Sequence, residues 1–201
     1  MSTARGKASR KRLLETAADL FLRQGVAATS VDRVLAEAGA GKSQFYHYFK
    51  NKQNLIQEVI GFRIQQFITE KQDLLENLDS WENLTLWLNS VVSWFCVGDH
   101  FNGCPIGVMA AEMAEQNEVL RQELVTAFEL WEHHIAAGLA KMKARGEIRN
   151  NADPTAMDQF VIAANQGALL LARTKQSESL LRNLHVQIMC WLKTHAQVPD
   201  D

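Results

Sequence analysis

The stretch "SVDRVLAEAGAGKSQFYHYF", residues 30–49, decides the fold of the first part of the chain. Residues 30–38 and 42–48 each place apolar side chains at helical spacing, and Gly39 and Gly41 stand between them. Two short helices joined by a glycine-containing turn form a helix-turn-helix, whose second helix enters the major groove of DNA. The stretch therefore predicts a DNA-binding element.

Gly41-Lys42-Ser43 also resembles the end of a nucleotide-binding phosphate loop. Such a loop has the pattern G-x-x-x-x-G-K-[ST] and lies between a buried strand and a long helix. Here Ala36 occupies the first glycine position, and the residues before Gly41 have the period of a helix rather than a strand. The sequence therefore favours contact with the phosphates of a nucleic acid over those of a nucleotide.

The second short helix, 42–48, is predicted to have two different faces. Phe45 and Phe49 lie four residues apart, so both are expected to pack inward. Tyr48 can either contact DNA or pack at the end of the helix. The leading turn and the outward face hold polar side chains that can reach bases or phosphates, namely Lys42, Ser43, Gln44, Tyr46 and His47.

The longer stretch "ETAADLFLRQGVAATSVDRVLAEAGAGKSQFYHYFKNKQNL", residues 15–55, resembles the DNA-binding domain of the TetR family of bacterial transcriptional regulators. The matching features are A-x-x-L-F ending at Phe21, then Gly25, Thr29-Ser30-Val31, K-x-x-x-Y-x-[HY]-F over 42–49, and Lys52. Ala40 and Gly41 replace the family's usual Val and Ser, so the serine cap of the recognition helix is missing. Glycine is a tolerable cap.

The resemblance implies an all-α fold in two parts. These are an N-terminal three-helix helix-turn-helix DNA-binding domain, 1–52, and a C-terminal helical ligand-binding and dimerisation domain, 53–201. The implied protein is a cytoplasmic transcriptional regulator, a repressor that binds a near-palindromic double-stranded DNA operator as a homodimer and is released by a small-molecule effector. Phosphates are expected to meet Thr29, Ser30, His47, Tyr48 and Lys52, and bases to meet Lys42, Ser43, Gln44 and Tyr46.

The rest of the chain is also predicted to be helical, without an alternating strand pattern. Three prolines in 201 residues suit long helices. Three cysteines without a C-x-x-C pair indicate a reduced, intracellular protein, and no apolar run approaches the roughly 18 residues of a membrane span. Apolar residues recur at helical spacing over 7–24, 52–77, 81–95, 105–115, 118–145, 154–173 and 178–195.

The charge of the chain is unevenly distributed. Residues 1–55 carry ten Lys or Arg against four acids, although the net charge of the whole chain is −2. A basic first quarter suits a module that faces nucleic acid. A solvated basic tail is the other explanation, because half of the positive charge comes from Arg5, Lys7, Arg10, Lys11 and Arg12.

Candidate effector contacts come from aromatic side chains outside the DNA-binding domain. A pocket between helices is lined by such residues and a few polar ones, although most of them will be ordinary core. An apolar or aromatic effector is expected, and no cofactor. The candidate contacts are Trp94, Met109, Phe128, Trp131 and Phe160, with His134, Asn165 or Gln166 as polar partners.

No metal site is expected from the six histidines and three cysteines. His133 and His134 point about 100° apart on a helix, so they do not easily share one ion. The chain contains no C-x₂₋₄-C or H-x₃-H pair, which are common metal-ligand spacings.

Small residues recur every four positions near the C-terminus. Ala164, Ala168 and Ala172 form such a seam, with Gly167 beside it. A seam of this kind lets two helices approach closely, and the resemblance assigns it to the dimer interface. The alternative is a seam packed only within one subunit.

Cys104 lies between Gly103 and Pro105, in the least regular segment of the chain. A thiol at a helix N-terminus has a lowered pKa, so one hypothesis is a thiol-sensing regulator in which modification of Cys104 by an electrophile releases DNA. The alternative is a small buried side chain at a tight turn.

Two other classes of protein compete with a DNA-binding regulator. A helical enzyme would need a convergent acid/base pair or a nucleophile motif, and the sequence shows neither, so no catalytic residue is expected. A helical protein-interaction module would use the same helix-turn-helix without binding DNA.

Overall fold

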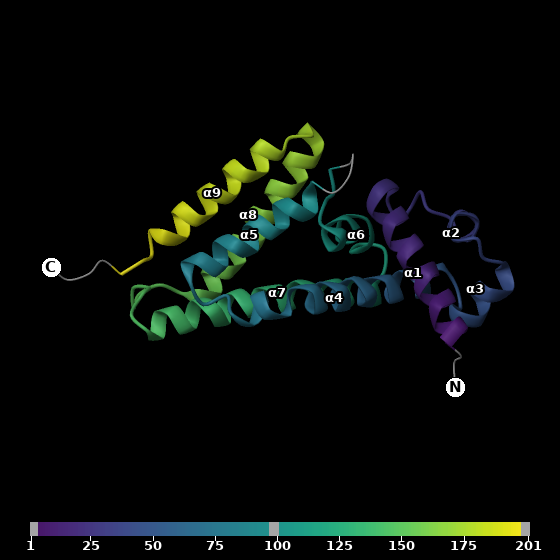
Figure 1. Cartoon of the computed structure of the whole chain (residues 1–201), viewed down its shortest axis with the longest axis horizontal. Helices are drawn as coiled ribbons and strands as arrows, with labels where there is room; N and C mark the ends of the chain where they lie inside the picture. The colour runs from purple at the N-terminus through teal and green to yellow at the C-terminus, as the bar shows by residue number, and fades with distance from the viewer. Residues whose placement is uncertain (1–3, 97–100, 198–201) are drawn as a thin grey trace. The chain divides into compact units, whose positions relative to one another are not determined.

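The computed structural model describes residues 4–96 and 101–197, and these form nine α-helices (Figure 1). Within those ranges the extended structure is limited to one isolated bridge between Ile148 and Ala196. The all-α prediction is confirmed. The helices are α1 (Ala4–Gln24), α2 (Val31–Ala38), α3 (Lys42–Tyr48), α4 (Lys52–Glu76), α5 (Trp81–Phe95), α6 (Pro105–Met113), α7 (Glu118–Ala144), α8 (Pro154–Lys175) and α9 (Glu178–Lys193).

None of the described helices combines the length and the apolar character that a membrane span requires. The contacts between residues divide the chain into two compact units. The first unit contains the residues up to Phe67 and, in addition, Pro105–Ala127, because α6 packs against α1. The second contains Ile68–Cys104 and the residues from Phe128 onward. The domain boundary expected after residue 52 falls at the first residue of α4. Helix α4 continues without a break to Glu76, and the first unit includes its residues up to Phe67.

The core of the first unit forms where α1, α2 and α3 meet. Phe21 of α1, Val34 of α2 and Phe45 of α3 are each at most 1% exposed, and so is Phe49 at the end of α3. The rings of Phe45 and Phe49 lie 5.4 Å apart. Full burial of each such side chain contributes about 1.5–3 kcal/mol, so these rings account for much of what holds the short helix α3 in place.

Gly25 caps the end of α1, and Ser30 caps the start of α2. Gly25 follows α1 with φ +87°, a left-handed conformation in which a side chain is strained. Ser30 precedes α2, and its hydroxyl oxygen accepts a hydrogen bond from the Arg33 N–H at 3.1 Å. Both caps confirm the expected ends of α1 and α2 and fix where the helix-turn-helix begins.

In the second unit, α9 packs against both α8 and α5. A buried polar pair lies between α8 and α9, where His185 Nε2 and Asn165 Oδ1 are 2.9 Å apart. Burial lowers the pKa of His185 to about 4, so its imidazole is neutral near pH 7. At Gly138 of α7, a Cβ would lie 2.1 Å from the carbonyl oxygen of Leu78, so only glycine permits this approach.

Candidate nucleic-acid interface

Helix α3 presents a polar face that the packing of its other face makes rigid. Phe45 is fully buried, whereas the neighbouring Tyr46 is 64% exposed. Lys42, Ser43 and His47 are exposed as well. The predicted division of α3 into an inward aromatic face and an outward polar face is therefore confirmed. A short helix fixed in this way can present side chains to the base edges of a major groove.

Lys42 begins α3 and forms an ion pair with Asp32 of α2, with 3.2 Å between Nζ and the carboxylate oxygen. The two side chains are 71% and 73% exposed. An exposed pair of this kind contributes at most about 1 kcal/mol, so DNA can displace it at little cost. Lys42 therefore stays available for a base or a phosphate.

Gln44 is engaged within the protein at both ends of its amide. Its Oε1 accepts a hydrogen bond from the Gly41 N–H at 3.2 Å, and its Nε2 donates to the Ser9 hydroxyl at 3.3 Å. The first bond satisfies a free N–H at the start of α3, where the family's serine is absent. The second ties α3 to α1. To read a base, Gln44 would have to exchange these bonds, each with a net contribution of about 0.5–1.5 kcal/mol.

Thr29 has a structural role that corrects the expectation of a phosphate contact through its hydroxyl. The residue is completely buried. Its hydroxyl donates to the Gly25 carbonyl oxygen at 2.7 Å and accepts from Gln24 Nε2 at 3.0 Å. A hydroxyl satisfied in this way and shielded from solvent cannot reach a phosphate. Thr29 instead holds the turn 25–29 that leads from α1 into α2.

Lys52 is also bonded inside the protein. Its Nζ donates a hydrogen bond to the carbonyl oxygen of Val26 at 2.7 Å, and the side chain is half-buried. This bond ties the start of α4 to the turn 25–29. An ammonium group has three donors, so Lys52 can hold this carbonyl and still face a phosphate. Its predicted phosphate contact stays a prediction.

Glu112 of α6 is a third anchor of the turn 25–29. Its Oε2 accepts a hydrogen bond from the Ala27 N–H at 2.8 Å. A Cβ at position 25 would lie 2.5 Å from Glu112 Oε1, so Gly25 leaves room for this carboxylate. Sequence reasoning missed Glu112, because the two partners are 85 residues apart and no local pattern marks it.

The remaining predicted DNA contacts lie at the ends of α2 and α3. Ser30 is exposed and caps α2 with its hydroxyl. His47 is exposed, and its ring lies 4.8 Å from that of Tyr48 in an edge arrangement. Tyr48 is half-buried and also contacts the ring of Phe49, at 6.2 Å. Tyr48 therefore packs at the end of α3, and its predicted phosphate contact stays a prediction.

Comparison with known proteins identifies this arrangement. Residues 81–187 match the family described as "Transcriptional regulator LmrA/YxaF-like, C-terminal domain", and residues 13–59 match "Bacterial regulatory proteins, tetR family". The first match alone covers more than half of the chain. The chain belongs to the TetR family of transcriptional regulators.

Several members of the TetR family are similar to the chain over most of its length. It is 29% identical to the HTH-type transcriptional regulator YxaF of Bacillus subtilis, over 92% of this chain and 95% of YxaF. It is 26% identical to the HTH-type transcriptional repressor DhaR of a Mycobacterium species, over 86% of each. A TetR protein of Rhodobacter sphaeroides superimposes with a TM-score of 0.83 at 22% identity, covering 94% and 99% of the two chains. This likeness shows the fold.

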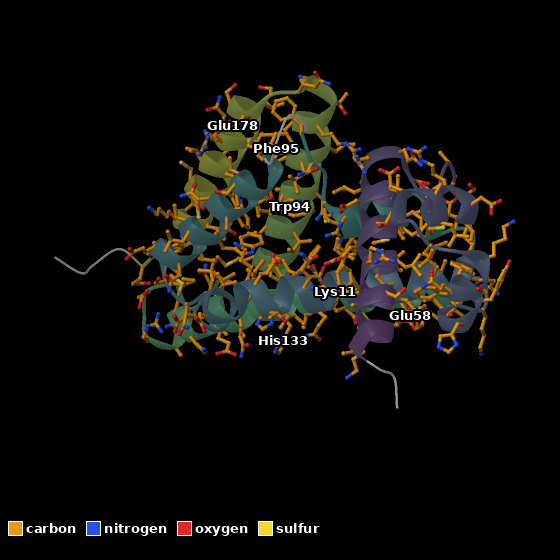
Figure 2. All side chains as sticks on the ribbon, turned by 45° about the vertical axis from the view of Figure 1, so that its right-hand side comes forward. Lys11, Glu58, Trp94, Phe95, His133 and Glu178 are labelled. Carbon is orange, nitrogen blue, oxygen red and sulfur yellow. The ribbon has the colours of Figure 1, made fainter. Side chains whose placement is uncertain are left out.

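The predicted effector contacts of this TetR-family regulator belong to both units. In the second unit Phe128 and Trp131 meet edge to face, 5.5 Å apart. Trp94 at the end of α5, labelled in Figure 2, is half-buried, and its indole N–H donates to the Gly103 carbonyl oxygen at 3.4 Å. Met109 is buried in α6, which belongs to the first unit.

Four other predicted effector contacts of the regulator differ in their exposure and in their partners. Phe160 is 39% exposed on α8 and stacks on Trp191 of α9 at 3.9 Å, and its predicted effector contact stays a prediction. Asn165 is buried, and His185 already occupies its Oδ1. Gln166 is half-buried. His134 is half-buried too, and burial lowers the pKa of its imidazole.

The small-residue seam of the regulator packs largely within one subunit. Ala168 is 2% exposed and Ala172 is fully buried, and α8 packs against α9 of the same chain. This corrects the assignment of both residues to a dimer interface, because neither has surface left for a partner. Ala164 and Gly167 are half-buried. The exposed large apolar side chains of α8 and α9 are Phe160 at 39%, Leu170 at 66%, Leu171 at 47% and Val186 at 56%.

The three thiols of the regulator differ in exposure. Cys104 is only 8% exposed and Cys190 is exposed. Cys96 is intermediate, and burial together with a hydrogen bond to Glu178 raises the pKa of its thiol. Access therefore favours Cys190 as the most reactive thiol, which speaks against the hypothesis that Cys104 is the first to react.

The second unit of the regulator contains a buried carboxylate, one oxygen of which has no hydrogen-bond partner among the described residues. Asp158 of α8 is 2% exposed, and its Oδ1 accepts no hydrogen bond from any described residue. Burial, with smaller effects of Glu132 and Asp153, raises its pKa to about 6. Among the described residues, no group of three His, Cys, Asp or Glu side chains could hold a metal ion.

Proposed function

We propose that the protein is a repressor that binds a near-palindromic operator as a homodimer and releases it when a small apolar or aromatic molecule binds. The observation that carries this proposal is α3, whose polar face is exposed while Phe45 and Phe49 fix its other face. Family membership and the similarity to a protein named as a repressor, DhaR, support it. A repressor of bacterial genes would act in the cytoplasm.

In this proposal α3 lies in the major groove. Lys42, Ser43 and Tyr46 read or abut base edges, while phosphates are held by Ser30, His47, Tyr48 and Lys52. Gln44 contributes mainly by fixing α3 against α1, since both ends of its amide are bonded there. Base reading and positioning are therefore assigned to different residues of the same short helix.

The exposed leucines of α8 support a dimer. Leu170 and Leu171 are adjacent, and Leu170 and Val186 of α9 are each more than half exposed. Apolar side chains that protrude from two neighbouring helices gain about 1.5–3 kcal/mol each when a partner covers them. A second copy of the chain is the proposed partner, as is typical of the family.

The effector would act through geometry. In the dimer each subunit presents one α3, and the distance between the two copies must match successive major grooves. A ligand that binds better to a form with a different distance lowers the operator affinity by about 1–3 kcal/mol, roughly 5- to 150-fold. The turn 25–29 is a suitable element for such a change, because α6 holds it through Glu112. Phe128 and Trp131 are proposed as effector contacts.

A gel shift on fragmented genomic DNA at stepped salt concentrations tests the proposal. Phosphate contacts impose a steep salt slope, so specific fragments should be retained at moderate salt and their recovery should reveal a near-palindromic sequence. A protein that retains no fragment at low salt would instead be an interaction module or an enzyme. Sedimentation without DNA tests the dimer directly.

A further inference from the structure

We propose that Arg12 of α1 contacts the sugar–phosphate backbone of the operator beside the base pairs that α3 reads. This inference rests on the proposed DNA binding and adds a contact outside the helix-turn-helix. It also decides between the two explanations of the basic N-terminal region, a surface that faces nucleic acid or a solvated tail.

The start of α1 lies against the recognition helix. Ser9 is only 7% exposed, and its hydroxyl accepts the hydrogen bond from Gln44 Nε2 of α3. An α-helix turns by about 100° per residue, so Arg12 lies about 60° around α1 from Ser9, whereas Lys11 lies about 160° away. Arg12 therefore projects from the side of α1 that adjoins α3, and Lys11 projects from the opposite side.

The three consecutive cations of α1 differ in their partners. Arg10 forms an ion pair with Glu58 of α4, and its guanidinium lies 5.9 Å from the centre of the Phe49 ring. Lys11 pairs with Glu15 at 3.6 Å. Figure 2 labels Lys11 on α1 and Glu58 on α4. Arg12 is exposed and forms no ion pair with any residue that the structure describes. Its guanidinium is therefore available for an external anion.

The helix dipole does not explain a cation at this position. Arg12 is eight residues from the start of α1, whereas the effect of the dipole falls off within the first turn. A guanidinium matches a phosphate group with two parallel hydrogen bonds. Because α1 is helical from Ala4, Arg12 is part of a folded surface continuous with α3 rather than of a tail.

The test compares Arg12→Ala with its neighbour Lys11→Ala. Both substitutions remove one positive charge from an exposed position of α1, and both variants should keep the wild-type melting temperature. Binding is measured by fluorescence anisotropy on a short duplex that carries the recovered operator, over a series of salt concentrations. Arg12→Lys serves as a third variant, since it keeps the charge.

A dimer loses two phosphate contacts in Arg12→Ala, so the salt slope should fall by about 2 and the affinity near 0.1 M salt by roughly 60-fold. Lys11→Ala should leave the slope unchanged, and Arg12→Lys should retain it. Equal effects of Arg12→Ala and Lys11→Ala, or no effect of Arg12→Ala, would overturn the assignment of Arg12 but not the proposed DNA binding. Failure of the wild-type protein to bind any duplex would instead overturn the proposed function.

Discussion

The substitution Asp158→Asn should stabilise the protein at neutral pH. Asp158 is 2% exposed, and its Oδ1 has no hydrogen-bond donor among the described residues. An ionised carboxylate in such a place has lost its hydration without gaining a partner. Asparagine has nearly the same shape and carries no charge, so it removes the cost of the charge with little change in packing.

The magnitude follows from the pKa of Asp158, which burial raises from 3.8 to about 6. A difference of about two units between the unfolded and the folded state corresponds to about 3 kcal/mol. Below about pH 4 the carboxyl group is protonated in both states and costs nothing. Between about pH 4 and pH 6 the unfolded state ionises first, so the free energy of unfolding falls. Above about pH 6 the full penalty is present.

The assay is urea unfolding of wild type and Asp158→Asn near pH 4 and near pH 7.5, at one fixed protein concentration, because dimer unfolding depends on concentration. The variant should gain about 3 kcal/mol over wild type near pH 7.5 and little near pH 4. Ser177→Ala is a control with the opposite sign. The Ser177 hydroxyl caps α9 by accepting from the Leu180 N–H at 3.2 Å, so its loss should cost about 1 kcal/mol near pH 7.5.

An advantage of Asp158→Asn that is the same at both pH values would refute the argument from ionisation. A loss of stability near pH 7.5 would show that the carboxylate has a favourable partner in the assembled protein. The comparison therefore tells whether the Asp158 carboxylate is a buried charge without a partner or a charge that a partner in the assembled dimer stabilises.

Three further experiments test other parts of the structure. Glu112→Ala should release the turn 25–29, lowering the unfolding free energy by about 1 kcal/mol and weakening operator binding in anisotropy without changing the dimer; an unchanged affinity would contradict its positioning role. Leu170→Glu should raise the dimer dissociation constant in sedimentation by roughly 100-fold, while Leu86→Glu should not, although Leu86 is also an exposed leucine, at 48%. Timed alkylation with mass spectrometry should modify Cys190 before Cys104, and the reverse order would revive the thiol-sensing hypothesis.

The parts of the fold that depend on local spacing could be predicted from the sequence. Phe45 and Phe49 are four residues apart, so their common inward face follows from helix geometry alone. Ser30 and Gly25 act as caps within a few residues of their own positions, and both were predictable for the same reason. The helix-turn-helix and the all-α fold follow from such local rules.

The roles of Thr29 and Lys52 could not be predicted in this way. Both are polar residues beside a DNA-binding motif, and only the tertiary structure shows that their polar atoms bind Gly25 and Val26. Ala168 shows the same limit. A small residue indicates that a helix approaches closely, but not whether that helix belongs to the same chain.

The first unit is assembled from two separate segments, and this has a consequence for synthesis on the ribosome. Its helices α1 to α3 leave the ribosome early, but Glu112 and the rest of Pro105–Ala127 follow only after about 60 more residues. At about 5–20 residues per second, the delay is roughly 3 to 12 seconds. A chain that terminates before residue 105 carries the whole recognition helix and lacks the carboxylate that holds the turn before α2. Prematurely ended chains are therefore poor competitors for the operator.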